Sequence, residues 1–96
     1  MKDPYIIIYD NFDDPEHENL FVEAITSNFV SKKGRENMYI IINDKELNSV
    51  DIFELIKSKL DIESNFIVVK LDDFYGTFNY HALEWLKHKF PDSNWK

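Results

Sequence analysis

The amino-acid sequence predicts a domain of the α+β class, in which a single sheet carries the helices. Three runs rich in β-branched and aromatic residues, at 5–9, 38–44 and 65–71, predict strands. Each run is followed, directly or after a loop, by a segment whose apolar residues recur at helical spacing. The 96 residues suit one domain over 1–96, and two glycines with three prolines predict short connections between the elements.

The run YIIIY at residues 5–9 predicts a central strand buried on both faces, because its apolar residues do not alternate with polar ones. Asp13 and Asp14, followed by Pro15, predict a capped helix start. Glu16 and Glu18 then place negative charge where the helix dipole is positive. We expect this helix to end near Phe29 and to bury Leu20, Phe21, Ala24, Ile25 and Phe29.

The segment VSKKGREN predicts a short strand and a turn around Gly34, leading into the second long strand. Asn48 or Ser49 is expected to cap a second helix, which buries Ile52, Phe53, Ile56 and Leu60. After the strand at 65–71, Asn79 can cap a last helix that stops at Pro91 and places Leu83, Leu86 and Phe90 on one face.

This order of elements favours a ferredoxin-like βαββαβ sheet with helices on one face and an additional C-terminal helix. The alternative is a three-stranded parallel αβα sandwich, which would apply if VSKKGR were only a loop. We favour the ferredoxin-like arrangement.

Charge and composition exclude several classes of protein. The net charge is −7, and residues 1–31 carry seven acidic side chains and one lysine. The basic cluster Lys32, Lys33 and Arg35 is the candidate for phosphate contact, but direct nucleic-acid binding should be weak or absent. Without cysteine there is no disulfide or thiolate metal site. No run reaches the roughly 20 apolar residues of a membrane helix, and MKDPYIII does not fit a signal peptide, so we expect a soluble cytoplasmic protein without membrane contact.

The candidate catalytic residue is Asp10, which ends the first strand. Asp10 and Asp13 could hold a hard cation such as Mg²⁺ or Mn²⁺, which would activate water for phosphodiester cleavage. Alternatively, Asp10 only begins the turn between strand and helix. His17, His81 and His88 offer no nucleophile–base pairing and are expected to be exposed.

The stretches YIIIYDNFDDPEHENLF and GRENMYIII resemble the small, non-integrase subunit family of the CRISPR spacer-acquisition complex. A looser likeness extends to the virulence-associated protein D family of small ribonucleases. The resemblance implies a homodimer whose two sheets face each other, with Asp10 near the dimer axis opposite its copy. It also implies either a metal-dependent nuclease or a bridge between catalytic partners. In place of the family's basic residue early in the first helix, this chain has Glu16, His17 and Glu18.

Three functions follow as hypotheses. The first, which we favour, is a homodimeric assembly module that binds a protein partner. The second is an acidic inhibitor that occupies the basic groove of a nucleic-acid enzyme, as in phage anti-defence or toxin-immunity systems. The third is an endonuclease that uses Asp10 from two subunits. The aromatic residues expected at an interface are Phe74, Tyr75, Phe78, Tyr80 and Trp85.

Overall fold

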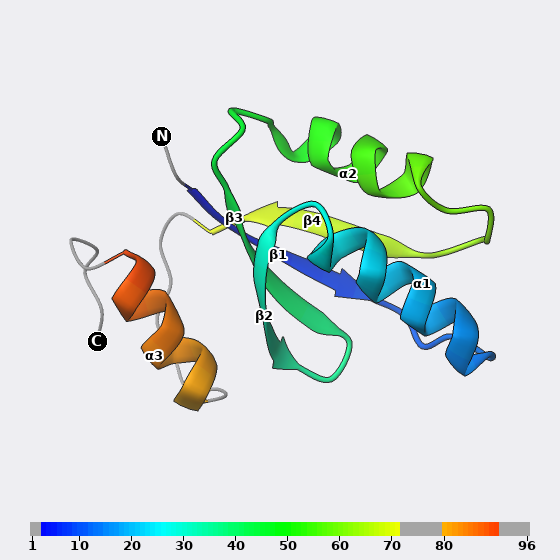
Figure 1. The fold of residues 1–96 in the computed structure, drawn as a ribbon, viewed down its shortest axis with the longest axis horizontal. Coiled ribbons are helices and arrows are strands. Elements are labelled where there is room, and N and C mark those ends of the chain that lie inside the picture. Colours follow the sequence, from blue (N-terminus) through cyan, green and yellow to red (C-terminus); the bar gives the residue numbers. More distant parts are fainter. Residues whose placement is uncertain (1–2, 72–79, 91–96) are drawn as a thin grey trace.

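The computed structural model describes residues 3–71 and 80–90, which form one antiparallel sheet and three helices (Figure 1). The elements are β1 (Asp3–Tyr9), α1 (Pro15–Thr26), β2 (Val30–Arg35), β3 (Met38–Asn43), α2 (Ser49–Ser58), β4 (Phe66–Lys70) and α3 (Tyr80–Lys89). The strands lie in the order β2-β3-β1-β4, and every neighbouring pair is antiparallel. The ferredoxin-like βαββαβ prediction is therefore confirmed, and the parallel αβα alternative is wrong.

The main core lies between one face of the sheet and the helices α1 and α2. Alternate residues of β1 point into it, so that Tyr5, Ile7 and Tyr9 are buried. Phe21 of α1 and Ile52 of α2 are fully buried against this face. The helices thus cover the same side of the sheet, as the crossover connections require.

The opposite face of the sheet carries α3. Ala82 and Leu86 of this helix are fully buried with Ile40 of β3, and Ile6 of β1 packs against the same cluster. This cover is incomplete, because Ile8 of β1 is 46% exposed. The prediction that β1 is buried on both faces is therefore wrong at its carboxyl end. The predicted cap Asn79 and stop Pro91 lie outside the described residues.

The β2–β3 hairpin turns later than the sequence predicts. Its turn is formed by Glu36 and Asn37, and Asn37 has a φ of 63°, a conformation that asparagine tolerates better than most residues. Gly34 is a buried strand residue, lying where the pairing slips between Lys33 and Arg35. Glycine at this position therefore marks a β-bulge, which bends the edge strand.

Both helix starts follow the predicted capping chemistry. The Asp14 carboxylate accepts a hydrogen bond of 2.9 Å from the Glu16 N–H, and Pro15 opens α1. Asn48 and Asp51 form a reciprocal capping box at the start of α2. Helix α1 ends at Thr26, three residues before Phe29, but Phe29 is still buried.

Candidate interaction surface

Three apolar side chains lie side by side on the face of the sheet that α1 and α2 do not cover. Ile8 pairs with Ile67 across the β1–β4 ladder, and the next position on this face of β4 is Val69. Their exposed fractions are 46%, 56% and 42% respectively. We call these residues the open-face patch. Single exposed apolar residues are common on protein surfaces, but a contiguous group marks a possible contact site.

The position of α3 explains why the patch remains open. This helix packs over Ile40 and Ile6, and the strand it contacts most is β2 at the far edge of the sheet. Within the described residues, the β4 side of this face has no comparable cover. The open-face patch is therefore the part of the second sheet face that lies beyond α3.

The patch adjoins a free sheet edge, because β4 pairs only with β1 among the described strands. The Asp10 N–H donates to the Asn65 carbonyl, and the Leu71 N–H donates to the Pro4 carbonyl, each bond measuring about 3 Å. Antiparallel ladders alternate, so the odd-numbered residues of β4 bond to β1 and the even-numbered ones point away. The backbone groups of Phe66, Val68 and Lys70 consequently face outward.

The other sheet edge, β2, differs in chemistry. It carries Lys32, Lys33 and Arg35, and its pairing is interrupted by the bulge at Gly34. Charged side chains and bulges are the usual devices that stop an edge strand from pairing with another chain. The predicted phosphate-contact residues thus lie on a protected edge, where Lys33 and Arg35 are exposed and Lys32 is half-buried.

Asp10 lies at the border of the open-face patch. It is exposed, directly follows β1, and by alternation belongs to the same sheet face as Ile8. Residues 3–71 and 80–90 contain no group of three or more histidine, aspartate or glutamate side chains placed to hold a metal ion. A metal site of the predicted kind would need carboxylates from a second copy, and catalysis by Asp10 stays a prediction.

The acidic residues after Asp10 divide into two groups. Asp14 is engaged as the cap of α1, and its second oxygen lies 3.9 Å from Nε2 of His17. Asp13 is exposed, and no contact of its side chain contributes to the helix start. Capping therefore accounts for Asp14, whereas Asp13 remains a predicted cation ligand.

Aromatic side chains pack beneath this end of the sheet. The ring of Phe21 lies 4.7 Å from that of Tyr9 and 5.0 Å from that of Phe66, and Phe53 stacks on Phe66 at 4.4 Å. The Tyr9 hydroxyl donates to the Glu18 carboxylate. Burial, and secondly the charge of Glu18, raises the pKa of Tyr9 to about 12. This packing fixes the helix side of β4 and leaves its outer edge free.

The predicted interface aromatics lie mostly outside the described residues. Phe74, Tyr75 and Phe78 lie outside the described residues, and α3 begins at Tyr80. Trp85 is half-buried and packs against the core beneath α3. The apolar residues that the structure exposes at the surface are instead aliphatic, and the available signal was the unbroken run FIVVK with no charge before Lys70.

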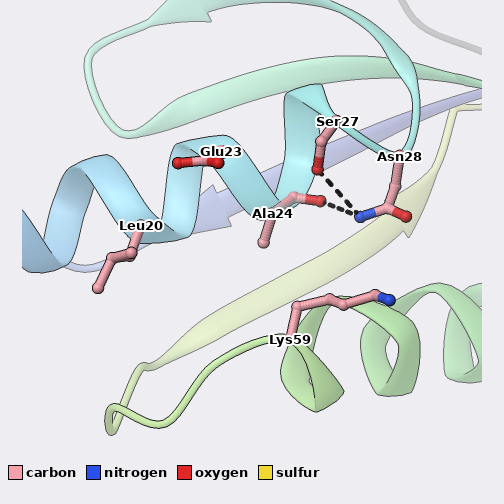
Figure 2. A pocket seen from close by; sticks show the side chains of 6 residues that line it. All are labelled: Leu20, Glu23, Ala24, Ser27, Asn28 and Lys59. Atoms are coloured by element: carbon pink, nitrogen blue, oxygen red, sulfur yellow. Dashed lines mark hydrogen bonds between the residues drawn. The ribbon is translucent and has the colours of Figure 1, made fainter.

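A shallow hollow of about 290 Å³ lies between α1 and α2 (Figure 2). Its lining comprises Leu20, Glu23, Ala24, Ser27, Asn28 and Lys59. The Asn28 amide already donates to the Ala24 carbonyl at 2.7 Å and to the Ser27 hydroxyl at 3.4 Å. The charged groups in the lining are Glu23 of α1 and Lys59, the residue that follows α2. The lining therefore offers no converging set of free polar groups of the kind that orients a small ligand.

Comparison of the chain with protein-family models, with curated proteins and with solved structures finds no match. What the resemblance to the CRISPR small subunit implies about function therefore stays a prediction. In the described part of the chain, no helix is long and apolar enough to cross a membrane. The surfaces best suited to bind another protein are the open-face patch, with its exposed aliphatic side chains, and the unpaired edge of β4.

Proposed function

We infer that this protein is a small acidic assembly module that forms a homodimer and acts through protein contacts. The supporting observation is the open-face patch, three aliphatic side chains that are each about half exposed beside an unpaired strand. Fully burying such a side chain stabilises by about 1.5–3 kcal/mol, so covering each half-exposed one is worth roughly 1 kcal/mol. A dimer gains this term, from both copies, for each of these side chains that it covers.

The test is the mass in solution, measured by sedimentation velocity across a range of concentrations. The wild-type protein should approach twice its chain mass of 11.5 kDa as concentration rises. Val69→Lys should shift this equilibrium to the monomer, because it puts a charge into the patch while its exposed position tolerates lysine in the fold. An increase of at least tenfold in the dissociation constant is expected, which is about 1.4 kcal/mol.

Val50→Lys is the matched control. Val50 is 66% exposed on α2, so the same change of side chain occurs away from the patch. This variant should associate as the wild type does. A wild-type chain that stays at 11.5 kDa at every concentration contradicts the homodimer, and equal weakening by both variants contradicts the assignment of the surface.

A second candidate function is supported by a different observation. The start of α1 and the loop before it carry a row of exposed carboxylates along the chain, at Asp10, Asp13 and Glu16. A row of this kind can complement the basic groove of a nucleic-acid enzyme and would act as an inhibitor by occupying it.

The inhibitor hypothesis calls for a combined capture and activity experiment. The protein should retain a basic nucleic-acid enzyme at low salt, release it at high salt, and reduce the activity of that enzyme. The double variant Asp13→Asn with Glu16→Gln should inhibit at least tenfold less. Inhibition that is equal for this variant, or insensitive to salt, would rule out the acidic row as the binding element.

A further inference from the structure

We propose that the homodimer forms edge to edge, with β4 of one copy pairing antiparallel to β4 of the other around Val68. This rests on the proposed function and gives it a geometry. The result would be one continuous sheet running through both copies, with the two open-face patches side by side on the same surface. The twofold axis would pass through the middle of the β4 pair.

The outer edge of β4 has unpaired backbone groups that could bond to another strand. Phe66, Val68 and Lys70 direct their backbone N–H and C=O groups outward, and no other strand of the described chain pairs with them. The strand has no proline or bulge, and its one charged residue, Lys70, stands at its end. Such an edge is a template for pairing, whereas β2 carries the protecting features.

Two copies of the same edge fit each other in one register. When Val68 lies opposite its own copy, Phe66 lies opposite Lys70, and every outward residue of the strand has a partner. Each of these pairs exchanges two hydrogen bonds. Ile67 then lies opposite Val69 of the second copy on the open face, which brings together two exposed aliphatic side chains.

Charge favours the antiparallel orientation over the parallel one. The chain carries exposed Asp61 and Glu63 just before β4 and exposed Lys70 at its end. An antiparallel copy directs each Lys70 toward the acidic end of its neighbour, while a parallel copy would set like charges together. The edge is thus self-complementary in charge as well as in hydrogen bonding.

A face-to-face dimer fits the structure less well. Helix α3 stands on the open face, over Ile40 and Ile6, so a second sheet cannot lie flat against that face. Edge pairing also has a consequence for Asp10, which lies opposite Asn65, three residues from the axis at Val68. At about 3.4 Å per residue the two copies of Asp10 would be about 20 Å apart along the strands, too far to share a metal ion.

The test uses single cysteines, since the wild-type chain has none. Ile67→Cys and Val69→Cys proteins are mixed in equal amounts, oxidised, and analysed by intact mass. The two sites form a non-hydrogen-bonded pair, with Cα atoms about 4.5 Å apart, which lies within disulfide range. The mixed disulfide should therefore greatly exceed its statistical share, because each variant alone places its two thiols at offset positions.

Ile8→Cys is the control for the competing geometry. Ile8 is exposed on the same face but lies one strand inward, so its thiols meet only if two sheets face each other. Lys70→Pro provides a second readout, because it removes an outward N–H without touching the bonds to β1. It should weaken the dimer at least tenfold relative to Lys70→Thr, which loses the same charge.

The outcomes separate this proposal from the proposed function. A dimer by mass in which Ile8→Cys cross-links to itself, or in which the mixed disulfide stays at its statistical share, overturns edge pairing and leaves the assembly module standing. Equal dimerisation of Lys70→Pro and Lys70→Thr does the same. A protein that is monomeric at every concentration overturns both.

Discussion

Asn43 illustrates how a single residue holds a loop of this protein in place. It is the buried polar side chain among the described residues, and it sits at the end of β3 with 1% of its surface exposed. Its amide donates to the Leu47 carbonyl at 2.5 Å, and its oxygen accepts from the Lys45 and Leu47 N–H groups at 3.2 and 3.4 Å. These bonds stabilise a loop in which Glu46 has a φ of 58°. Between β3 and α2, the Asn43 side chain thus makes the hydrogen bonds to the backbone that a helix or strand would otherwise supply.

We expect Asn43→Ala to lower the free energy of unfolding by about 2 kcal/mol, because it removes the hydrogen bonds of a buried side chain to the Lys45 and Leu47 backbone. Urea denaturation measures this. Asn65→Ala is the control, since Asn65 is exposed and its change should stay within about 0.5 kcal/mol. A loss below that level for Asn43→Ala would mean that water replaces the side chain.

Tyr9 leads to a prediction at alkaline pH. Its pKa is raised from 10.0 to about 12, first by burial and then by Glu18. The folded state therefore holds the phenolic proton more tightly than the unfolded state, and this part of the stability is complete below pH 10 and lost as pH rises through about 12. Tyr9→Phe should remove that loss from the pH profile of unfolding.

Phenolate absorbance measures the titration of Tyr9 directly, as the difference between wild type and Tyr9→Phe. Glu18→Gln should lower the pKa of Tyr9 without returning it to 10.0, because burial is the larger cause. A Tyr9 that titrates near 10 in the folded wild type would contradict the packing of its ring between Phe21 and Tyr39.

At the scale of elements, the helix starts depend on local chemistry. Asn48→Ala breaks the capping box of α2 and should cost about 1 kcal/mol of unfolding free energy. Asn48→Ser keeps a capping oxygen and should stay close to the wild type. Thermal or urea unfolding of the two variants measures this difference. Equal stability of Asn48→Ala and Asn48→Ser would show that the cap does not contribute to the free energy of unfolding.

The same local character explains what could be predicted from the sequence. The capping contacts form within one turn of chain, between residues close in sequence: Asp14 with Pro15, and Asn48 with Asp51. The local sequence was therefore enough to locate the helix starts. The sequence predicted the hairpin turn around Gly34, and only the pairing with β3 shows that Gly34 lies at the bulge and Asn37 in the turn. The spacing of apolar residues along the sequence indicates local structure better than it indicates which strands pair with each other.

The candidate surface was harder to predict for the same reason. The run at residues 5–9 looks buried on both faces because nothing in it marks where α3 ends, so the exposure of Ile8 was missed. Ile67 and Val69 read as ordinary strand residues until the strand order places β4 at an edge. Asp10 was correctly placed at the end of β1, while its predicted role depends on a second copy that one sequence does not position.

At the scale of the whole molecule, charge opposes self-association. Each copy carries a net charge of −7, so two copies repel each other beyond their contact surface. Raising the salt concentration from about 0.05 to about 0.5 M shortens the screening length and should tighten the dimer several-fold. Sedimentation at both concentrations measures this. Weaker association at high salt would instead indicate that ion pairs hold the copies together.

Hydrogen exchange of the β4 amides, followed by NMR at rising protein concentration, examines the paired edge itself. The amides of Ile67 and Val69 bond to β1 and should be protected at every concentration. Those of Phe66, Val68 and Lys70 face outward, and their protection should grow as the fraction of dimer rises. If these three amides exchange rapidly while the dimer is fully formed, β4 does not join the two copies.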